Sequence, residues 1–302
     1  MELLQHWFTA MGGPCEFQLG TSTAGQARIA FGMAEHEVRR IEAKYSRYRP
    51  DSLLSRINAH AGGDWLDCDD ETLHLLEVAH RLHEDSGGLF DATSGVLRRA
   101  WRFDGSAQAP DDQTLAPLLA LVGWGGVQRR GREVRLAKAG MELDFGGFGK
   151  EYAVDRVATL LQKAGVAHGL VNLSGDIRVW GGRPGGQPWN LGIQHPRQTG
   201  ALLASLPLQS GALATSGDYE RYFIDASGKR HCHILHPMTG RPACHWRSVS
   251  VVAPLALMAG GLSTCAMLMG EAAGSWLAQQ PVDFLAIDEN GSRFSSNPRG
   301  VA

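Results

Sequence analysis

The stretch Asp144-Phe-Gly-Gly-Phe-Gly-Lys150, followed directly by Glu151-Tyr-Ala-Val-Asp155, contains a carboxylate, three glycines and a lysine before a helical pattern. This arrangement is typical of a phosphate cradle. Glycines let the backbone approach an anion closely, and the N–H groups of the first helical turn and the lysine neutralise it. A second interpretation stays open, because a glycine-rich turn also permits tight strand-to-helix packing without any ligand.

The spacing of this stretch differs from two common nucleotide-binding motifs. Its glycines fall at 146, 147 and 149, which is not the G-x-G-x-x-G pattern. Neither Ser nor Thr follows Lys150, so it is not a P-loop.

The bulk composition is that of an ordinary globular protein. The 302 residues are 43% hydrophobic and 20% charged, with a net charge of −2. Nothing in this balance indicates nucleic acid or an anionic membrane as a partner. The longest uncharged stretch, Pro254 to Gly270, is shorter than the ~20 apolar residues of a membrane span.

The cysteines and the first residues bear on the cellular compartment. An odd number of cysteines without a C-x-x-C pair argues against a disulfide framework and suits a reducing compartment. They are Cys15, Cys68, Cys232, Cys244 and Cys265. The start Met1-Glu-Leu-Leu-Gln-His-Trp7 has no pattern of a secretory signal. We therefore expect a cytoplasmic protein, or a periplasmic one if a leader has been removed.

Apolar spacing predicts helices and strands that alternate and also come in pairs. Helices are expected over 26–45, 73–82, 153–164 and 262–277. Strands are expected over 16–19, 133–136, 169–173, 177–180, 248–253 and 284–287. Turn signals at 224–229 and at Asn290-Gly291 predict hairpins. The pattern favours an α+β fold with antiparallel sheet, in which two lobes share one continuous domain over residues 1–302.

Two further loops carry polar side chains between glycines. In Gly87–Gly95, Asp91 and Thr93 are placed to bond a polar ligand edge while Phe90 packs on its apolar part; the alternative is an Asx turn after a helix. Val171-Asn-Leu-Ser-Gly-Asp176 brings an amide, a hydroxyl and a carboxylate to a strand end, which is a common place for ligand groups. Its alternative is a β-bulge at Gly175.

The segment His231-Cys-His-Ile-Leu-His-Pro-Met-Thr-Gly240 concentrates histidines. His231 and His233 would share one strand face, where a histidine pair can bind zinc, but no third ligand is evident. We favour one histidine as a general base, with 237–240 as a shaped turn. A solvated, histidine-rich strand end is the alternative.

Two aromatic or glycine-rich segments add weaker signals. Tyr45-Ser-Arg-Tyr-Arg-Pro-Asp-Ser52 suits stacking of a flat ring, or the buried end of a helix. Met11-Gly-Gly-Pro-Cys15 suits either close approach of a ligand to the backbone or a plain turn.

The order of these pieces along nearly the whole chain resembles the ApbE family of FAD-dependent flavin transferases. The matching pieces are Met11-Gly-Gly, Tyr48-Arg-Pro-Asp-Ser-Leu-Leu-Ser-Arg-Ile-Asn58, Gly88-Leu-Phe-Asp-Ala-Thr93, Asp144–Lys150, Asn172-Leu-Ser-Gly-Asp176, His233-Ile-Leu-His-Pro-Met-Thr-Gly240 and Leu262-Ser-Thr264.

The resemblance implies an ApbE-type fold and an FAD site. The residues that it places at FAD are Met11, Tyr48, Leu89, Phe90, Asp91, Asp144, Lys150 and Ile234. The polar patterns described above add Thr93, Asn172 and Asp176. The resemblance also implies a Mg²⁺ ion at the FAD pyrophosphate, held by the backbone oxygens of Gly147 and Ser263 and the hydroxyl of Thr264.

The implied reaction moves FMN from FAD onto a Thr or Ser hydroxyl of a target flavoprotein and releases AMP, with His233 as general base. Phosphoryl transfer needs charge neutralisation and in-line positioning more than covalent participation by the enzyme. Two other activities stay open: an FAD pyrophosphatase that forms FMN and AMP, and an FAD-binding protein without catalysis.

The chain departs from the family pattern at the expected metal site. An aspartate normally stands four residues before the threonine, and here that position is Gly260. Glu151 follows Lys150, where the family usually has glycine. If 147 and 151 are helical neighbours, the Glu151 carboxylate reaches toward the metal. The simpler alternative is an outward, solvated glutamate at a helix start.

Overall fold

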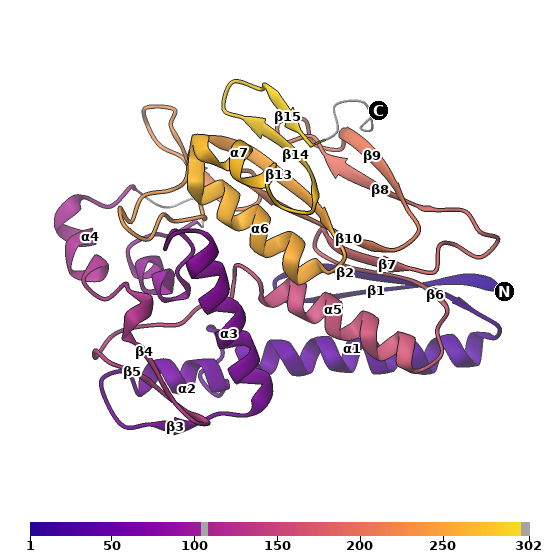
Figure 1. Ribbon diagram of the computed structural model, residues 1–302, viewed down its shortest axis with the longest axis horizontal. Helices are drawn as coiled ribbons and strands as arrows, with labels where there is room; N and C mark the ends of the chain where they lie inside the picture. Colours follow the sequence, from indigo (N-terminus) through magenta and orange to yellow (C-terminus); the bar gives the residue numbers. More distant parts are fainter. Residues whose placement is uncertain (104–107, 297–302) are drawn as a thin grey trace.

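The computed structural model describes residues 1–103 and 108–296. Within them, a larger lobe is built on an eight-stranded sheet and a smaller lobe holds a sheet of three short strands (Figure 1). The large sheet consists of β1 (Glu2–Ala10), β2 (Gly13–Thr21), β6 (His168–Leu173), β7 (Asp176–Trp180), β10 (Gly211–Gly217), β13 (Trp246–Ala253), β14 (Asp283–Asp288) and β15 (Arg293–Ser295). These strands lie side by side in that order, and each pair is antiparallel.

Helices cover one face of the large sheet, and a β-hairpin covers the other (Figure 1). The covering elements are the helices α1 (Ala24–Tyr45), α5 (Gly149–Lys163), α6 (Ala256–Met269) and α7 (Ala273–Leu277), and the hairpin of β8 (Trp189–Gln194) and β9 (Leu202–Leu208). Side chains alternate between the faces of a strand. On β13, Val249 and Val251 therefore pack toward α6, while Val252 packs toward the hairpin.

The smaller lobe lies beside the first turns of α5 (Figure 1). It contains α2 (Leu53–Ala59), α3 (Asp70–Asp85), α4 (Asp112–Leu119), the 3-10 helix η1 (Ala92–Arg99), β3 (Leu66–Asp67), β4 (Val127–Arg130) and β5 (Glu133–Leu136). Its buried residues Leu54 and Leu75 belong to the same hydrophobic cluster as Phe17 and Val171 of the large sheet. The shared core confirms two lobes in one continuous fold; a single domain over 1–302 stays a prediction.

The predicted elements correspond to observed ones, with shifted boundaries. The helices predicted over 26–45, 73–82 and 153–164 are α1, α3 and α5, and all six predicted strands are present. The helix predicted over 262–277 is in fact α6, which begins at Ala256, followed after a break at Gly270 by α7. Gly270 has φ +58°, a left-handed conformation that ends α6. Both hairpin signals are confirmed, by the β14–β15 turn and by β11 (Tyr222–Ile224) with β12 (Arg230–Cys232).

The segment 104–117, in which Asp, Pro and Ala are prominent, lies partly outside the described residues. Residues 104–107 are not described, and α4 occupies Asp112–Leu119.

The N-terminus of α6 is capped by a side chain from another helix. The Asp155 carboxylate of α5 accepts hydrogen bonds from the backbone N–H groups of Ala256 (3.0 Å) and Leu257 (2.9 Å). Arg178 on β7 pairs with the same carboxylate at 2.7 Å. These bonds satisfy otherwise free N–H groups and hold α5 and α6 in register.

By length and composition alone, the helical stretch Ala256–Leu277 is apolar enough to cross a membrane. Most of it is buried in the fold, as in the core helix of a globular protein.

Candidate active site at one edge of the sheet

Two tight turns bring predicted site residues to the same edge of the large sheet. Met11 and Gly12 form the two-residue turn between β1 and β2, with φ +53° and +81°. Ser174 and Gly175 form the turn between β6 and β7, with φ +53° and +96°. Positive φ at both central residues matches a type I′ hairpin turn. The β-bulge considered at Gly175 is therefore wrong: a hairpin turn occupies this position.

The loop before α5 is fixed by an ionic cluster around Asp144. The Asp144 carboxylate accepts from Arg47 at 2.9 Å and pairs with Arg98 at 3.1 Å. Its other oxygen accepts from the backbone N–H of Gly146 at 2.8 Å. Burial opposes ionisation of Asp144, but Arg98 and Arg47 outweigh it and hold its pKa below the usual range. A charged Asp144 therefore anchors the glycine-rich loop.

The lysine of the motif is engaged with the carboxylate at the start of β7. Lys150 Nζ lies 2.5 Å from Asp176 Oδ2, and the Asp176 side chain is 5% exposed. Burial raises the pKa of Asp176 despite the lysine. Burial also disfavours the Lys150 cation, but the carboxylates of Asp176 and Glu151 raise its pKa above the ordinary value. The pair therefore joins a partly exposed lysine to a buried carboxylate.

The three residues expected at the metal lie close together. Thr264 Oγ1 of α6 is 3.4 Å from the backbone oxygen of Gly147. Ser216 of β10 lies 2.8 Å from Ser263 Oγ and 3.1 Å from Thr264 Oγ1. A Cβ on Gly147 would lie only 2.9 Å from the Phe90 ring, so glycine is required there. The fold therefore brings together the start of α5, the middle of α6 and the end of β10.

Glu151 lies in the first turn of α5 and faces α6. Gly147 precedes this helix, so residues 147 and 151 are not the helical neighbours considered from the sequence. Glu151 is 6% exposed, and its Oε2 has no hydrogen-bond partner in the described part of the chain. Burial, with the nearby Asp176 carboxylate, raises the pKa of Glu151. A Cβ on Gly260 would lie 2.5 Å from both Cγ and Oε1 of Glu151. The outward, solvated glutamate considered from the sequence is therefore wrong.

His233 lies just after β12 and is the candidate general base. Its backbone N–H donates to the carbonyl of Arg221 at 3.0 Å, and its buried Nδ1 has no partner among the described residues. Burial, followed by the positive charges of Arg98 and Arg221, lowers its pKa to about 4. His233 is therefore neutral at physiological pH and able to accept a proton.

The other histidines of this segment have structural partners. His231 Nε2 lies 2.8 Å from Asp225 Oδ2, and its ring stacks on Phe223 with centroids 4.9 Å apart. The backbone carbonyl of His236 accepts from Gly240 at 2.8 Å and closes the turn predicted over 237–240. In residues 1–103 and 108–296, no cluster of three His, Cys, Asp or Glu side chains suits a metal. The structure thus offers the zinc alternative no support.

Several predicted FAD contacts already hold the protein together. Asp91 Oδ1 accepts from both the N–H (2.8 Å) and the hydroxyl (2.6 Å) of Thr93. Asp91 Oδ2 accepts from the N–H of Trp124 at 2.9 Å. Asn172 Oδ1 accepts from the N–H of Gly175 at 2.8 Å. These are turn and capping bonds, and a role in FAD binding stays a prediction for Asp91, Thr93 and Asn172.

The apolar candidates lie at different depths. Phe90 is buried, Met11, Leu89 and Ile234 are half-buried, and Tyr48 is 74% exposed. A large exposed ring such as Tyr48 is available for stacking against a flat ligand.

Sequence reasoning missed three residues that shape this region. Ser216 links Ser263 to Thr264, Arg98 pairs with Asp144, and Arg221 holds the backbone of His233. Ser216 gave no signal because β10, Gly-Ala-Leu-Ala-Thr-Ser-Gly, has neither strand-like alternation nor strong β-formers. Nothing in the sequence around Arg98 and Arg221 marks them as site residues. Only the fold places Arg98 beside Asp144 and Arg221 beside His233.

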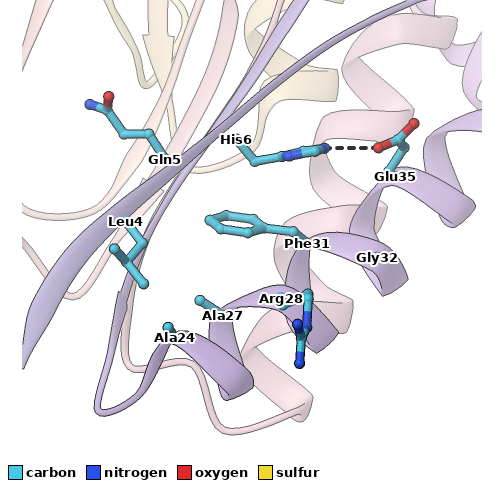
Figure 2. Close-up of a pocket in the computed structure, with 9 residues that line it drawn as sticks. All are labelled: Leu4, Gln5, His6, Ala24, Ala27, Arg28, Phe31, Gly32 and Glu35. Carbon is cyan, nitrogen blue, oxygen red and sulfur yellow. Dashed lines mark hydrogen bonds and ion pairs between the residues drawn. The ribbon is translucent and has the colours of Figure 1, made fainter.

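A surface hollow of about 410 Å³ lies elsewhere, between β1 and α1. Figure 2 shows its lining, in which His6 meets Glu35 at 2.8 Å beside the Phe31 ring. None of the predicted site residues lines it, so its position does not alter the assignment of the site.

Comparison with known proteins identifies the same family as the sequence motifs. The ApbE family model covers residues 11–287. The chain belongs to the ApbE family. The FAD:protein FMN transferase of Vibrio cholerae is 33% identical over 79% of this chain and 73% of its own length. That of Haemophilus influenzae is 32% identical, over 76% of this chain and 70% of its own length.

Solved structures confirm the fold of this ApbE-family chain. The ApbE protein from Thermotoga maritima has a TM-score of 0.91 and 30% identity, covering 98% of this chain and 97% of its own. The flavin transferase ApbE from Vibrio cholerae has a TM-score of 0.87 and 27% identity, covering 98% of each chain. The predicted α+β, ApbE-type class is therefore confirmed.

Proposed function

We propose that this chain is an FAD:protein FMN transferase, which moves FMN from FAD onto a Thr or Ser hydroxyl of a target flavoprotein and releases AMP. The observation that carries the proposal is the family match over residues 11–287, whose relatives are named for this activity. Lys150 lies near enough to His233 for its charge to help lower the pKa of the histidine, and Thr264 contacts Gly147 just before α5. This grouping supports the proposal, because phosphoryl transfer depends on charged and basic groups positioned around one reacting phosphate.

In the proposed site, FAD lies along the sheet edge. Lys150 and the first turn of α5 neutralise the pyrophosphate, since free N–H groups and a cation both attract anions. Tyr48 stacks on a flat ring of FAD. The proposed lining is Met11, Tyr48, Leu89, Phe90, Asp91, Thr93, Asp144, Lys150, Asn172, Asp176 and Ile234.

The residues present fit a magnesium ion. Gly147 O and Thr264 Oγ1 are oxygen atoms only 3.4 Å apart. Glu151, whose Oε2 has no partner among the described residues, meets α6 at Gly260, one helical turn before Thr264. Hard oxygen ligands are those that Mg²⁺ prefers. We propose Gly147, Ser263 and Thr264 as protein ligands; when bound, the ion supplies charge neutralisation at the pyrophosphate.

His233 is the proposed general base. The target hydroxyl oxygen bonds to the FMN-side phosphorus as its proton passes to His233, and the bond from that phosphorus to the bridging oxygen breaks, so that AMP leaves. A neutral imidazole is required at the start of this step, and burial together with Arg98 and Arg221 keeps His233 neutral by lowering its pKa.

The test is incubation of the purified chain with FAD and MgCl₂, with and without synthetic Ser- and Thr-containing acceptor peptides. Chromatography follows AMP and FMN, and mass spectrometry follows covalent flavin on the peptide. Peptide-bound FMN with equimolar AMP supports the transferase. Free FMN and AMP in equal amounts, with every peptide unmodified, supports the pyrophosphatase instead. Intact FAD in all samples contradicts both.

A further inference from the structure

We propose that the Glu151 carboxylate is the charged ligand of a divalent-cation site where α5 meets α6. The proposal rests on the proposed function, because it concerns the ion expected at the FAD pyrophosphate. It assigns the anionic ligand of this chain to a residue of α5, beside the neutral oxygens of Gly147 and Thr264.

The first observation is a buried carboxylate oxygen without a partner. Glu151 is 6% exposed, and within the described residues its Oε2 accepts no hydrogen bond. The adjacent cation, Lys150, is turned to Asp176 at 2.5 Å. Buried carboxylates are normally paired, hydrogen-bonded or bound to a metal. Glu151 therefore has room for a cation that the protein itself does not supply.

The second observation is the space made for this side chain in α6. Cβ atoms essentially never come as close as the 2.5 Å that would separate a Cβ on Gly260 from Glu151 Cγ and Oε1. Glycine inside a helix is less favourable than alanine, because the unfolded chain loses more conformational freedom there. A glycine buried in the middle of α6 therefore holds open the volume that the carboxylate fills.

The third observation is the set of contacts along one face of α6. Gly260 and Thr264 are four residues apart within α6, so they lie one above the other on that face. Thr264 Oγ1 is 3.4 Å from Gly147 O at one level, and Glu151 meets Gly260 at the next. A carboxylate, a carbonyl and a hydroxyl thus lie along one seam, which is an oxygen set suited to Mg²⁺ or Mn²⁺.

Direct metal binding tests this assignment without relying on turnover. Mn²⁺ is titrated into the full chain, with and without saturating FAD, and free Mn²⁺ is followed by electron paramagnetic resonance. Glu151→Gln keeps the size of the side chain and removes its charge. We expect Mn²⁺ affinity with FAD present to fall at least tenfold, since loss of even an outer-shell partner costs about 10- to 100-fold.

Asp155→Asn is the matched control, because it makes the same change on the same buried helix, one turn further on. Its Mn²⁺ affinity is expected to stay within about twofold of the unaltered chain, and both variants are expected to keep their FAD affinity in EDTA. A folded Glu151→Gln that binds Mn²⁺ as tightly as the unaltered chain overturns the assignment. An equal loss in Asp155→Asn overturns it as well, because the effect would then follow from the packing of α5.

If the unaltered chain transfers FMN and Glu151→Gln keeps full Mn²⁺ affinity, the ligand assignment fails while the transferase stands. If no flavin product forms but Mn²⁺ binding depends on Glu151, the ligand assignment stands while the transferase fails.

Discussion

Glu151 of α5 and Gly260 of α6 share one volume: Oε1 of the glutamate lies 2.5 Å from the point that a Cβ on the glycine would occupy. The carboxylate can occupy this volume only because position 260 is glycine, since a side chain there would displace it.

The first prediction concerns this pair. Gly260→Ala is expected to lower the free energy of unfolding by about 1–3 kcal/mol through overpacking, even though alanine favours a helix by about 1 kcal/mol over glycine. Adding Glu151→Gly should remove the penalty. Urea unfolding in EDTA measures both. Gly274→Ala in α7 is the control, because nothing lies within 4 Å of its Cβ position. A Gly260→Ala variant as stable as this control would contradict the shared volume.

The second prediction concerns the cap between helices. Asp155→Ala removes the hydrogen-bond acceptor of the Ala256 and Leu257 N–H groups and leaves Arg178 without its carboxylate partner. We expect the free energy of unfolding to fall by about 2–4 kcal/mol. Asp155→Asn keeps an acceptor oxygen and should lose less than half of that. Thermal unfolding of the two variants makes the comparison, and equal losses would show that the hydrogen bonds to α6 contribute little.

The third prediction concerns Lys150 and Asp176. Lys150→Met leaves Asp176 buried without its cation and should cost about 2–4 kcal/mol near pH 7. The folded-state pKa of Asp176 is already raised, and it should rise further when the lysine is removed. The variant is therefore most stable at pH values below the ordinary carboxyl pKa, and its stability decreases as pH rises and Asp176 ionises. The double variant with Asp176→Asn should recover most of the loss. Unfolding at pH 5 and pH 8 is the measurement; a loss that shrinks with rising pH would refute the linkage.

The fourth prediction concerns His233. With a pKa of about 4 in place of the ordinary 6.5, the acid limb of kcat/KM for FMN transfer should lie near 4. The folded pKa is depressed, so the contribution of the neutral ring to stability is complete above 6.5 and is lost as pH falls through 4. His233→Gln should reduce transfer about 10²- to 10⁴-fold, with FAD affinity nearly unchanged. An acid limb at 6.5 that survives in His233→Gln would assign the base elsewhere.

The fifth prediction concerns Tyr48, whose side chain is largely exposed. Tyr48→Ala should change the free energy of unfolding by less than about 0.5 kcal/mol. It should weaken FAD binding by about 0.5–1.5 kcal/mol, the usual worth of an aromatic pair. Quenching of flavin fluorescence in EDTA reports the affinity. Tyr48→Phe is the control and should bind FAD normally; an Ala variant with unchanged affinity would remove Tyr48 from the site.

Sequence reasoning predicted the regular elements wherever a periodic apolar pattern meets a turn signal. The helix α1 and the hairpin at Asn290-Gly291 are examples, because both depend on neighbouring residues alone. It missed six strands: β1, β3, β4, β8, β9 and β10. The small residues of β10 form a strand only because β7 and β13 pair with it on both sides, and β1 is a half-exposed edge strand.

The sequence by itself determined the family, the glycine-rich loop before α5 and the candidate base His233, because motifs and their order are local properties of the chain. Only the tertiary structure decided which way Glu151 points, that Ser216 bridges Ser263 and Thr264, and that Asp144 is held by Arg47 and Arg98. These facts depend on how α5, α6 and β10 pack together. Packing brings residues that are far apart in the sequence into contact, and local sequence patterns do not show which of them will meet.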